Sequence, residues 1–282
     1  QYEIIDALES QGMEVQFYYP ESGPGQHEIS IKNTDPLTAA DNQILYRETV
    51  RNIAERHWLK ASFAPKPIKD APGNGCHIHL SLWDEKNKTN LFYNAEDKHL
   101  LSSLGYNFTG GILKHTPALL AVTAPSVNSY RRLKPFCWSS AFTCWGPENR
   151  EATVRLIQPV DESEKSGINL EYKPADPSMN PYLALGSLIA AGLDGIKNQI
   201  LPGKPVLCDP ATLSDEQRRN LNIKRYPETL SESLDEFEKD ELFKTAFGDD
   251  LFKVFTAGRR SEAELFSQKD DDFEIANHKF IY

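Results

Sequence analysis

The stretch PGNGCHIHLSLW, residues 72–83, sets two histidines and a cysteine directly after a glycine-rich turn. A strand over residues 76–83 would place alternate side chains on opposite faces. The apolar face, which suits a protein core, would carry Cys76, Ile78, Leu80 and Leu82. The other face would carry His77, His79 and Ser81. A solvated face explains any one of these polar residues, but three of them beside a turn with accessible backbone N–H groups favour a binding site.

The overall composition is that of an acidic globular protein. The chain has 282 residues, 39% hydrophobic and 26% charged, with a formal net charge of −10. This length suffices for one large domain or two small ones. The absence of clustered Lys and Arg argues against nucleic acid as a partner. Clustered carboxylates, in contrast, need a neutralising partner such as a divalent cation.

The cysteines and the apolar runs indicate the compartment. Cys76, Cys137, Cys144 and Cys208 include no CxxC pair, which argues against a zinc ribbon or a thioredoxin-like site. Scattered cysteines fit a reducing, cytoplasmic environment. No signal peptide is recognisable, and no apolar run is long enough to span a bilayer, so we expect no membrane association. The chain begins with Gln1 inside a helical pattern, and we expect a segment to precede it.

The order of predicted elements favours the α+β class. Strands are expected at residues 13–21, 26–32, 61–67, 76–83, 142–146, 152–157 and 169–174. Asp35 and Pro36 read as the start of a helix that ends near residue 58. Residues 97–124 are expected to be helical with a break near Pro117, and residues 180–196 form a buried helix in which Gly186 and Gly192 allow close packing. The chain beyond residue 210 is charged and helical. These elements show no regular βαβ alternation.

Carboxylates stand at two points where they would meet a cation. Glu21 and Glu28 flank a Gly-Pro-Gly turn, so adjacent strands would bring them side by side. Like charges held together favour a cation between them, although two exposed glutamates remain the simpler interpretation of this pair alone. Glu171 and Lys173 share one face of a strand that precedes the buried helix.

Arginines supply the complementary charge. Arg132, Arg150 and Arg155 lie near turns and strand ends, where the planar guanidinium can bind carboxylate or phosphate, although most arginines only pair with surface acids. Carboxylates with one imidazole suit Mg²⁺ or Mn²⁺. Cations that hold phosphates, with arginines that stabilise developing charge, are the components of phosphoryl transfer from ATP. No Walker A motif is present, which excludes a P-loop NTPase.

Five motifs together resemble the glutamine synthetase family. They are ESGPGQHEI (21–29), GNGCHIHLSLW (73–83), NSYRRLKP (128–135), ENREATVRL (148–156) and EYKPADPSMNPYLAL (171–185). Their order and spacing agree with the family from about residue 10 to the C-terminus, most closely with the glutamine-synthetase-like branch of type I. The resemblance implies the catalytic domain of this family over residues 1–282, with a curved, mostly antiparallel sheet and flanking helices as in guanidino kinases. A guanidino kinase itself is disfavoured because its cysteine signature is not evident.

The resemblance implies two divalent metal ions, Mg²⁺ or Mn²⁺, with ATP as co-substrate. Glu21 and Glu28 match the family's ligands of the first ion. His77 and Glu171 match ligands of the second ion, which contacts the nucleotide phosphates. The implied reaction is phosphorylation of the glutamate side chain, followed by attack of an amine on the acyl phosphate.

The resemblance also assigns residues to the nucleotide and to glutamate. His79 and Ser81 match residues on the ATP side. Gly73 lies where the family's backbone holds the substrate amino acid, and Arg132 matches the arginine that binds its α-carboxylate. Lys173 stands where many members have Arg, so a bidentate contact would become a point contact.

Arg150 and Arg155 match the family's catalytic arginines, which steady the transferring phosphate. A departure follows Arg132: the position of the family's ammonium-binding glutamate holds Trp138. An indole cannot accept a proton, though it can line an apolar pocket or stack on a cation. We therefore expect an organic amine as the acceptor; ammonia and no acceptor at all are the alternatives.

The family's N-terminal β-grasp domain and its E-x-E metal-binding strand are expected to be absent from this chain. In the family this domain of a neighbouring subunit completes each active site in a homo-oligomeric ring. The ExE at residues 236–238 lies in a helical pattern and is no substitute. The isolated chain is therefore expected to be nearly inactive and not to form the ring. An inactive relative with a structural or regulatory role is the alternative.

Overall fold

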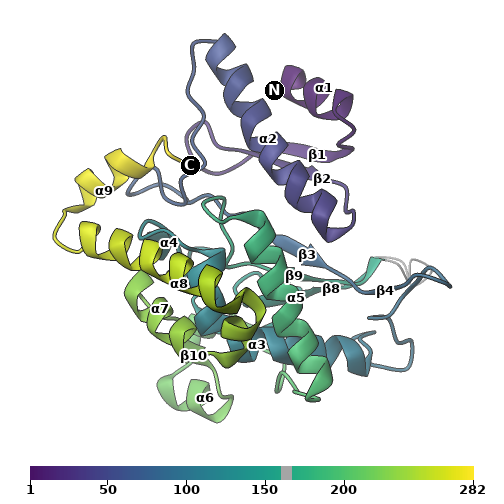
Figure 1. Ribbon diagram of the computed structural model, residues 1–282. Helices are drawn as coiled ribbons and strands as arrows, with labels where there is room; N and C mark the ends of the chain where they lie inside the picture. Colours follow the sequence, from purple (N-terminus) through teal and green to yellow (C-terminus); the bar gives the residue numbers. More distant parts are fainter. Residues whose placement is uncertain (160–166) are drawn as a thin grey trace.

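The computed structural model describes residues 1–159 and 167–282, and its N-terminal part is a hairpin beside two helices (Figure 1). Helix α1 (Tyr2–Ser10) precedes the antiparallel strands β1 (Val15–Pro20) and β2 (His27–Ile31), and α2 (Pro36–Arg56) follows. The Asp35 side chain accepts hydrogen bonds from the backbone N–H groups of Leu37 and Thr38, both at 3.1 Å. The predicted Asp-Pro helix start is thus confirmed.

The largest sheet has four short strands in the order β3-β9-β8-β7. They are β3 (Ile78–Leu80), β9 (Asn169–Tyr172), β8 (Val154–Ile157) and β7 (Trp145–Pro147). Both pairs that involve β9 are antiparallel, and β7 is parallel to β8. Two-stranded pairs are formed by β4 (Trp83–Asp84) with β5 (Thr89–Asn90) and by β6 (Phe142–Thr143) with β10 (Lys224–Arg225). The α+β class with mostly antiparallel sheets is confirmed.

The strand expected over residues 61–67 is wrong, because this segment, which contains Pro65 and Pro67, forms no strand. The strand expected over residues 76–83 is shorter than predicted, because β3 covers only Ile78–Leu80. Its division into two faces holds. Ile78 is buried, and the three other residues of the predicted apolar face pack against the core, namely Cys76, Leu80 and Leu82. The strand therefore has an apolar inner face, and its polar residues stand on the other side.

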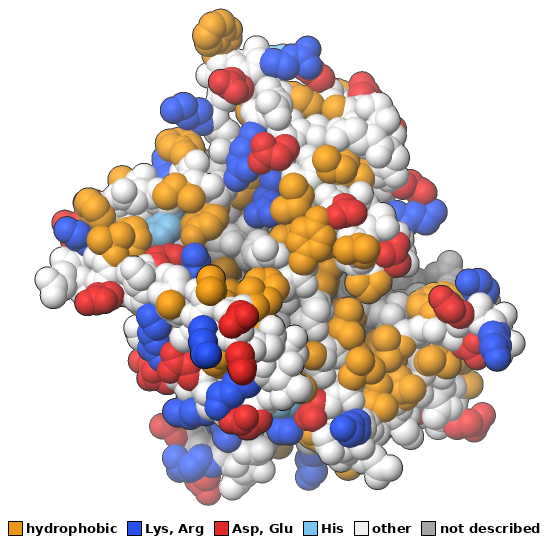
Figure 2. Space-filling model, in the orientation of Figure 1, with side chains coloured by type: hydrophobic (Ala, Val, Ile, Leu, Met, Phe, Trp, Pro, Cys, Tyr) orange, Lys and Arg blue, Asp and Glu red, His pale blue; other side chains and the backbone are white. Residues whose placement is uncertain are grey.

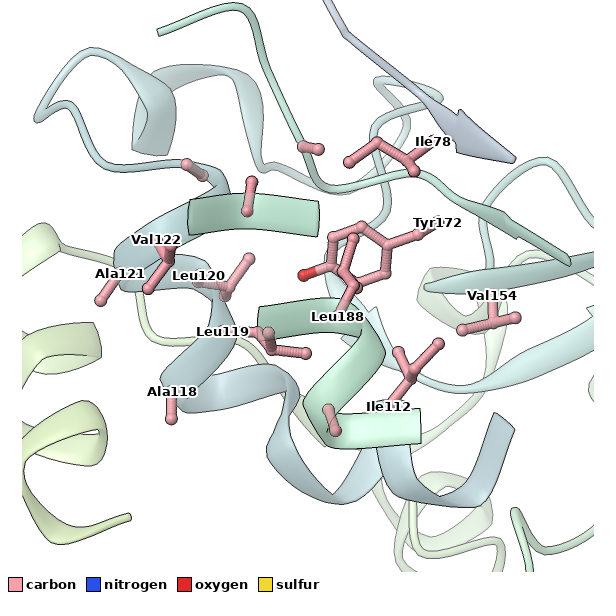
Figure 3. Packing of buried hydrophobic residues seen from close by; sticks show 14 of the residues in the cluster. Ile78, Ile112, Ala118, Leu119, Leu120, Ala121, Val122, Val154, Tyr172 and Leu188 are labelled. Atoms are coloured by element: carbon pink, nitrogen blue, oxygen red, sulfur yellow. The ribbon is translucent and has the colours of Figure 1, made fainter. Parts of the chain in front are cut away.

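The helical elements that follow in the described chain are α3 (Ser103–Thr123), α4 (Ser129–Arg132), α5 (Pro181–Lys197), the 3₁₀ turn η2 (Pro210–Thr212), α6 (Asp215–Asn220), α7 (Leu230–Lys239), α8 (Glu241–Phe266) and α9 (Asp271–His278). Of these, α3 and α5 share a core with the apolar face of the sheet (Figure 3). In Figure 3, Leu119 of α3 and Leu188 of α5 pack beneath Tyr172 of β9 and Val154 of β8. The Tyr172 hydroxyl lies 3.1 Å from Thr123 Oγ1 at the end of α3. The core thus joins the sheet to α3 and α5.

The predicted break near Pro117 is wrong, because α3 runs continuously through this residue. A proline inside a helix removes one hydrogen bond and costs about 3 kcal/mol. Most residues of α3 are buried against α5 and α7, and this tertiary burial offsets that cost.

Glycines set the distance between α3 and α5. A Cβ on Gly195 would lie 2.0 Å from the Asn107 carbonyl and 2.6 Å from Gly111 N, so the two backbones touch there. A Cβ on Gly192 would overlap Phe108, which confirms its predicted role. Gly186 has nothing within 4 Å of such an atom, so its predicted packing role is wrong.

A buried imidazole ties four helices together. His115 of α3 places Nδ1 2.6 Å from Asp240 Oδ2 and Nε2 3.0 Å from Asp194 Oδ2 of α5. Asp240 lies between α7 and α8 and caps α8 through Leu242 N. Lys114 also reaches Asp194. Burial alone would lower the pKa of His115, but its hydrogen bonds to the carboxylates of Asp240 and Asp194 raise it overall.

Acidic and basic side chains alternate over the face drawn in Figure 2, without a broad area of one sign. Among the helices of the described chain, none is long and apolar enough to cross a membrane.

Candidate active site

The end of the β1–β2 hairpin brings Glu21 and Glu28 together, as predicted. Tyr19 lies opposite Glu28 in the hairpin, and its hydroxyl is 2.8 Å from Glu21 Oε1 and 2.9 Å from Glu28 Oε2. Burial and the charge of Glu21 raise the pKa of Glu28. Partial burial opposes ionisation of Glu21 too, but hydrogen bonds from Ser22 N–H and Tyr19 lower its pKa. One hydroxyl proton cannot satisfy two carboxylates, so the pair attracts a cation.

Glu171 is the centre of a second, buried cluster. It lies on β9 between His79 of β3 and Arg155 of β8 in the sheet register. Its carboxylate is 2.9 Å from His77 Nδ1, 3.1 Å from Lys173 Nζ and 3.3 Å from Arg155 Nη1. Burial alone would raise the pKa of Glu171, but the hydrogen bond from His77 and the positive charge of Lys173 lower it well below the usual range.

The two clusters face each other. The charge of Glu171 contributes to the raised pKa of Glu28, which places the hairpin carboxylates within electrostatic range of the sheet. The hairpin turn is also tied to the glycine-rich stretch, because Gln26 Nε2 donates to Gly73 O at 3.0 Å and to Asn74 Oδ1 at 2.8 Å. The structure therefore brings together the predicted metal ligands of the hairpin and of the sheet.

Arg132 lies beneath the glycine-rich stretch. Its Nη1 donates to Pro174 O at 2.8 Å and its Nη2 to Lys173 O at 2.9 Å. A Cβ on Gly73 would lie 3.0 Å from Arg132 Cγ, and one on Gly75 would lie 2.6 Å from Arg132 Nη2. Only glycine allows this close approach. Arg132 Nη2 also lies 3.4 Å from His77 Nε2, so Nη1 is the terminal nitrogen that keeps a second N–H for a ligand.

The three predicted basic residues beyond Arg132 differ in their placement. Lys173 is buried against Glu171. Arg155 joins Glu171 to Glu148, which accepts hydrogen bonds from its Nε and Nη2 atoms. Arg150 is exposed in the turn between β7 and β8, and within the described ranges its side chain has no ion-pair partner. The structure therefore does not bring Arg150 into the Glu171 cluster.

His79 and Ser81 lie at the outer end of β3. His79 Nδ1 is 2.8 Å from Asn169 Oδ1, and Ser81 Oγ accepts from Trp83 Nε1 at 2.9 Å. His77 keeps 30% of its side-chain surface exposed, yet burial together with the charges of Lys173 and Arg132 lowers its pKa. A neutral imidazole is the form that binds metals.

Trp138 stands in an exposed loop that follows Arg132. Its ring is 63% exposed, and its backbone has φ 51°, a left-handed conformation that is uncommon for a bulky residue. The Trp138 N–H donates to Glu151 Oε1 at 2.8 Å. This contact holds the loop against the β7–β8 turn.

Sequence reasoning missed Gln26, Glu148 and Glu151. All three lie inside the quoted motifs. Gln26 and Glu151 bind groups 47 and 13 residues away, so spacing alone did not assign them a role, whereas the pairing of Glu148 with Arg155 lies within one motif and could have been found. Among the residues that the structure describes, no three His, Cys, Asp or Glu side chains form a group ready to hold a metal ion. The donors stand instead as two pairs, Glu21 with Glu28 and His77 with Glu171.

A family model described as the catalytic domain of glutamine synthetase matches residues 1–278. The γ-glutamylpolyamine synthetase GlnA3 of Streptomyces coelicolor is 38% identical over 280 residues, which cover 99% of this chain and 60% of that protein. A glutamine synthetase of Pyrococcus furiosus is 41% identical over 264 residues, 94% of this chain and 58% of that protein.

Solved structures agree with these matches. One described as a novel glutamine synthase homolog has a TM-score of 0.87 at 33% identity, covering 99% of this chain and 62% of that one. A complex of GmaS with ADP has a TM-score of 0.85 at 31% identity, covering 98% and 62%. The chain thus spans about three fifths of the length of these relatives.

Proposed function

Because the chain belongs to the glutamine synthetase family and represents its catalytic domain, we propose that it serves an ATP-dependent carboxylate–amine ligase. The reaction joins the γ-carboxylate of glutamate to an amine through a γ-glutamyl phosphate. The observation that carries the proposal is the cluster around Glu171, where Arg155, Lys173 and His77 surround one buried carboxylate that faces the hairpin carboxylates.

The donor atoms fit hard divalent cations. Glu21 and Glu28 would hold one ion, since they are oxygen donors with a single hydroxyl between them. His77 and Glu171 would hold another, with His77 neutral. Such ions, Mg²⁺ or Mn²⁺, would screen phosphate charge when bound. ATP would lie on the side of His79 and Ser81.

The basic residues would bind the two anionic substrates. Arg132 would hold the α-carboxylate of glutamate with its remaining N–H groups, beside the Gly73 backbone. Arg155 and Lys173 would stabilise charge on the transferring phosphate. Arg150 would need to turn inward from its exposed position to assist.

The acceptor is proposed to be an organic amine. Trp138 offers no carboxylate to an ammonium ion, and its exposed ring suits a carbon chain or a cation–π contact. The similarity to a γ-glutamylpolyamine synthetase supports the same choice. A cytoplasmic location and a homo-oligomeric ring of the full-length protein belong to the same proposal.

An inactive relative is the second candidate function. The absence of a preformed group of three metal donors among the described residues favours it. The buried charges of Lys173 and Glu171 argue against an inactive relative, because burying charges destabilises the fold and a purely structural protein would gain nothing from it.

The test is phosphate release from ATP by the full-length gene product with glutamate, Mg²⁺ or Mn²⁺, and either ammonium, methylamine, ethanolamine or putrescine. We expect release that requires both glutamate and an amine, with kcat/KM higher for an organic amine than for ammonium. Arg155→Lys should lower kcat at least tenfold. No turnover and no nucleotide binding by calorimetry would refute the ligase, and a preference for ammonium would refute the choice of acceptor.

A further inference from the structure

Glu151 is a buried carboxylate that has no role in the reaction proposed above. It lies in the turn between β7 and β8 and is 8% exposed. It accepts hydrogen bonds from the backbone N–H groups of Trp138 and Ser140. In the described part of the chain, no Lys, Arg or His reaches it within ion-pair distance, and the nearby charge of Asp209 is repulsive. A buried carboxylate in this state favours a cationic ligand.

The loop that Glu151 holds is strained and presents aromatic rings. Phe136, Trp138 and Ser140 all have positive φ, at 62°, 51° and 65°. Phe136 and Trp138 are 69% and 63% exposed. The base of the loop is firm, because Ser139 Oγ donates to Arg132 O at 2.6 Å. The loop therefore carries apolar surface that is fixed next to the carboxylate.

Glu151 lies within electrostatic range of Lys173, which the reaction proposed above places at the transferring phosphate. Burial raises its pKa, and the charge of Lys173 acts in the opposite direction, so the two side chains lie within electrostatic range without forming an ion pair. Lys173 itself is bound to Glu171. A cation beside Glu151 would thus stand next to the residues proposed to hold the transferring phosphate.

We propose that Glu151 binds the ammonium group of the organic amine substrate, while the rings of Phe136 and Trp138 contact its carbon chain. This assignment rests on the proposed ligase function and names the residue that selects its acceptor. Glu151 thereby acts in amine binding and not in the transfer of phosphate. Selectivity for a cationic amine arises because one negative charge is desolvated beside apolar surface.

The alternative is that Glu151 only fastens the loop through the two backbone N–H groups. Glu151→Gln separates the two roles, because the amide oxygen still accepts from Trp138 N–H while the charge is lost. The matched control is Glu228→Gln, which neutralises an exposed glutamate that pairs with Arg225 near the same loop. Each variant is made in the full-length protein, and its unfolding temperature is measured.

The experiment compares the KM for putrescine, glutamate and ATP, and also uses hydroxylamine, an acceptor that is mostly uncharged at pH 7.5. For Glu151→Gln we expect the KM for putrescine to rise at least tenfold. The other two KM values, kcat/KM with hydroxylamine and the unfolding temperature should stay close to those of wild type and of Glu228→Gln.

An unchanged KM for putrescine would overturn the assignment and leave the ligase intact. A parallel rise in all KM values with a lower unfolding temperature would also overturn it, since Glu151 would then only support the loop. If the wild-type protein used no amine at all, the proposed function would fail, and this assignment with it.

Discussion

The Glu171→Gln substitution removes the negative charge that faces His77, Lys173 and Arg155. Lys173 is only 4% exposed, and its ion pair is to Glu171, so the variant leaves a buried ammonium group without its partner. Breaking a buried ion pair in this way typically costs about 3–5 kcal/mol. Arg155 keeps Glu148, and His77 has a lowered pKa and is neutral at pH 7, which places the expected loss near 3 kcal/mol.

Urea denaturation of the 282-residue chain in EDTA, followed by tryptophan fluorescence, measures this loss. With an m-value of about 3 kcal/mol/M, the midpoint should fall by roughly 1 M. Glu171→Gln combined with Lys173→Met should recover most of the stability, because the unpaired charge is gone. Glu236→Gln is the control: its partner Lys239 is exposed, and the change should stay within about 0.5 kcal/mol. A loss below about 1 kcal/mol for Glu171→Gln, or no recovery in the double variant, would refute the account of a buried charge cluster.

Three further perturbations test other parts of the molecule. The pKa of His115 is raised in the folded state, so protonated His115 stabilises the fold fully below the unfolded pKa of about 6.5, and this contribution is lost as pH rises through the folded pKa. The unfolding temperature of His115→Gln should therefore fall less steeply than that of wild type above pH 6.5, and an equal slope would contradict this. Gly195→Ala should destabilise the fold by about 3 kcal/mol or more, because the new Cβ would overlap backbone atoms of α3. Gly186→Ala should be neutral or stabilise by up to about 1 kcal/mol. Thermal unfolding measures both changes, and equal effects would disprove the packing argument. Mn²⁺ should raise the unfolding temperature of the full-length protein, and the double variant Glu21→Gln, Glu28→Gln should show a smaller rise. A rise equal to that of wild type would show that these residues do not bind the metal.

Local sequence signals predicted those parts of the fold that depend on residues close to one another in the sequence. The Asp35 cap, the hairpin that joins Glu21 to Glu28, and the division of β3 into two faces depend on residues a few positions apart. The order of predicted elements indicated the α+β class, and the family resemblance, now confirmed by the family match, added the mostly antiparallel sheet with flanking helices. The roles of the individual site residues stay predictions.

Features that depend on distant contacts were not predictable in this way. Pro117 stays inside a helix because of burial against other helices. Gly186 was expected at a close contact that Gly195 makes instead, since the crossing point of α3 and α5 is set by the whole core. Glu151 meets Trp138 across 13 residues through a backbone N–H, a partner that no side-chain pattern reveals.

The central claim is that glutamate is activated as an acyl phosphate before an amine attacks. In that step a γ-carboxylate oxygen bonds to the γ-phosphorus of ATP and ADP leaves. The attacking ammonium group then loses a proton, and the free amine nitrogen bonds to the γ-carbon and loses a second proton. Phosphate departs with the carboxylate oxygen, and the two protons pass to phosphate and water. Full-length protein supplied with glutamate labelled with ¹⁸O in its γ-carboxylate, ATP and an organic amine should therefore release phosphate that carries one ¹⁸O atom, with equal formation of the γ-glutamyl amide. Unlabelled phosphate, or phosphate release without amide, would contradict the account.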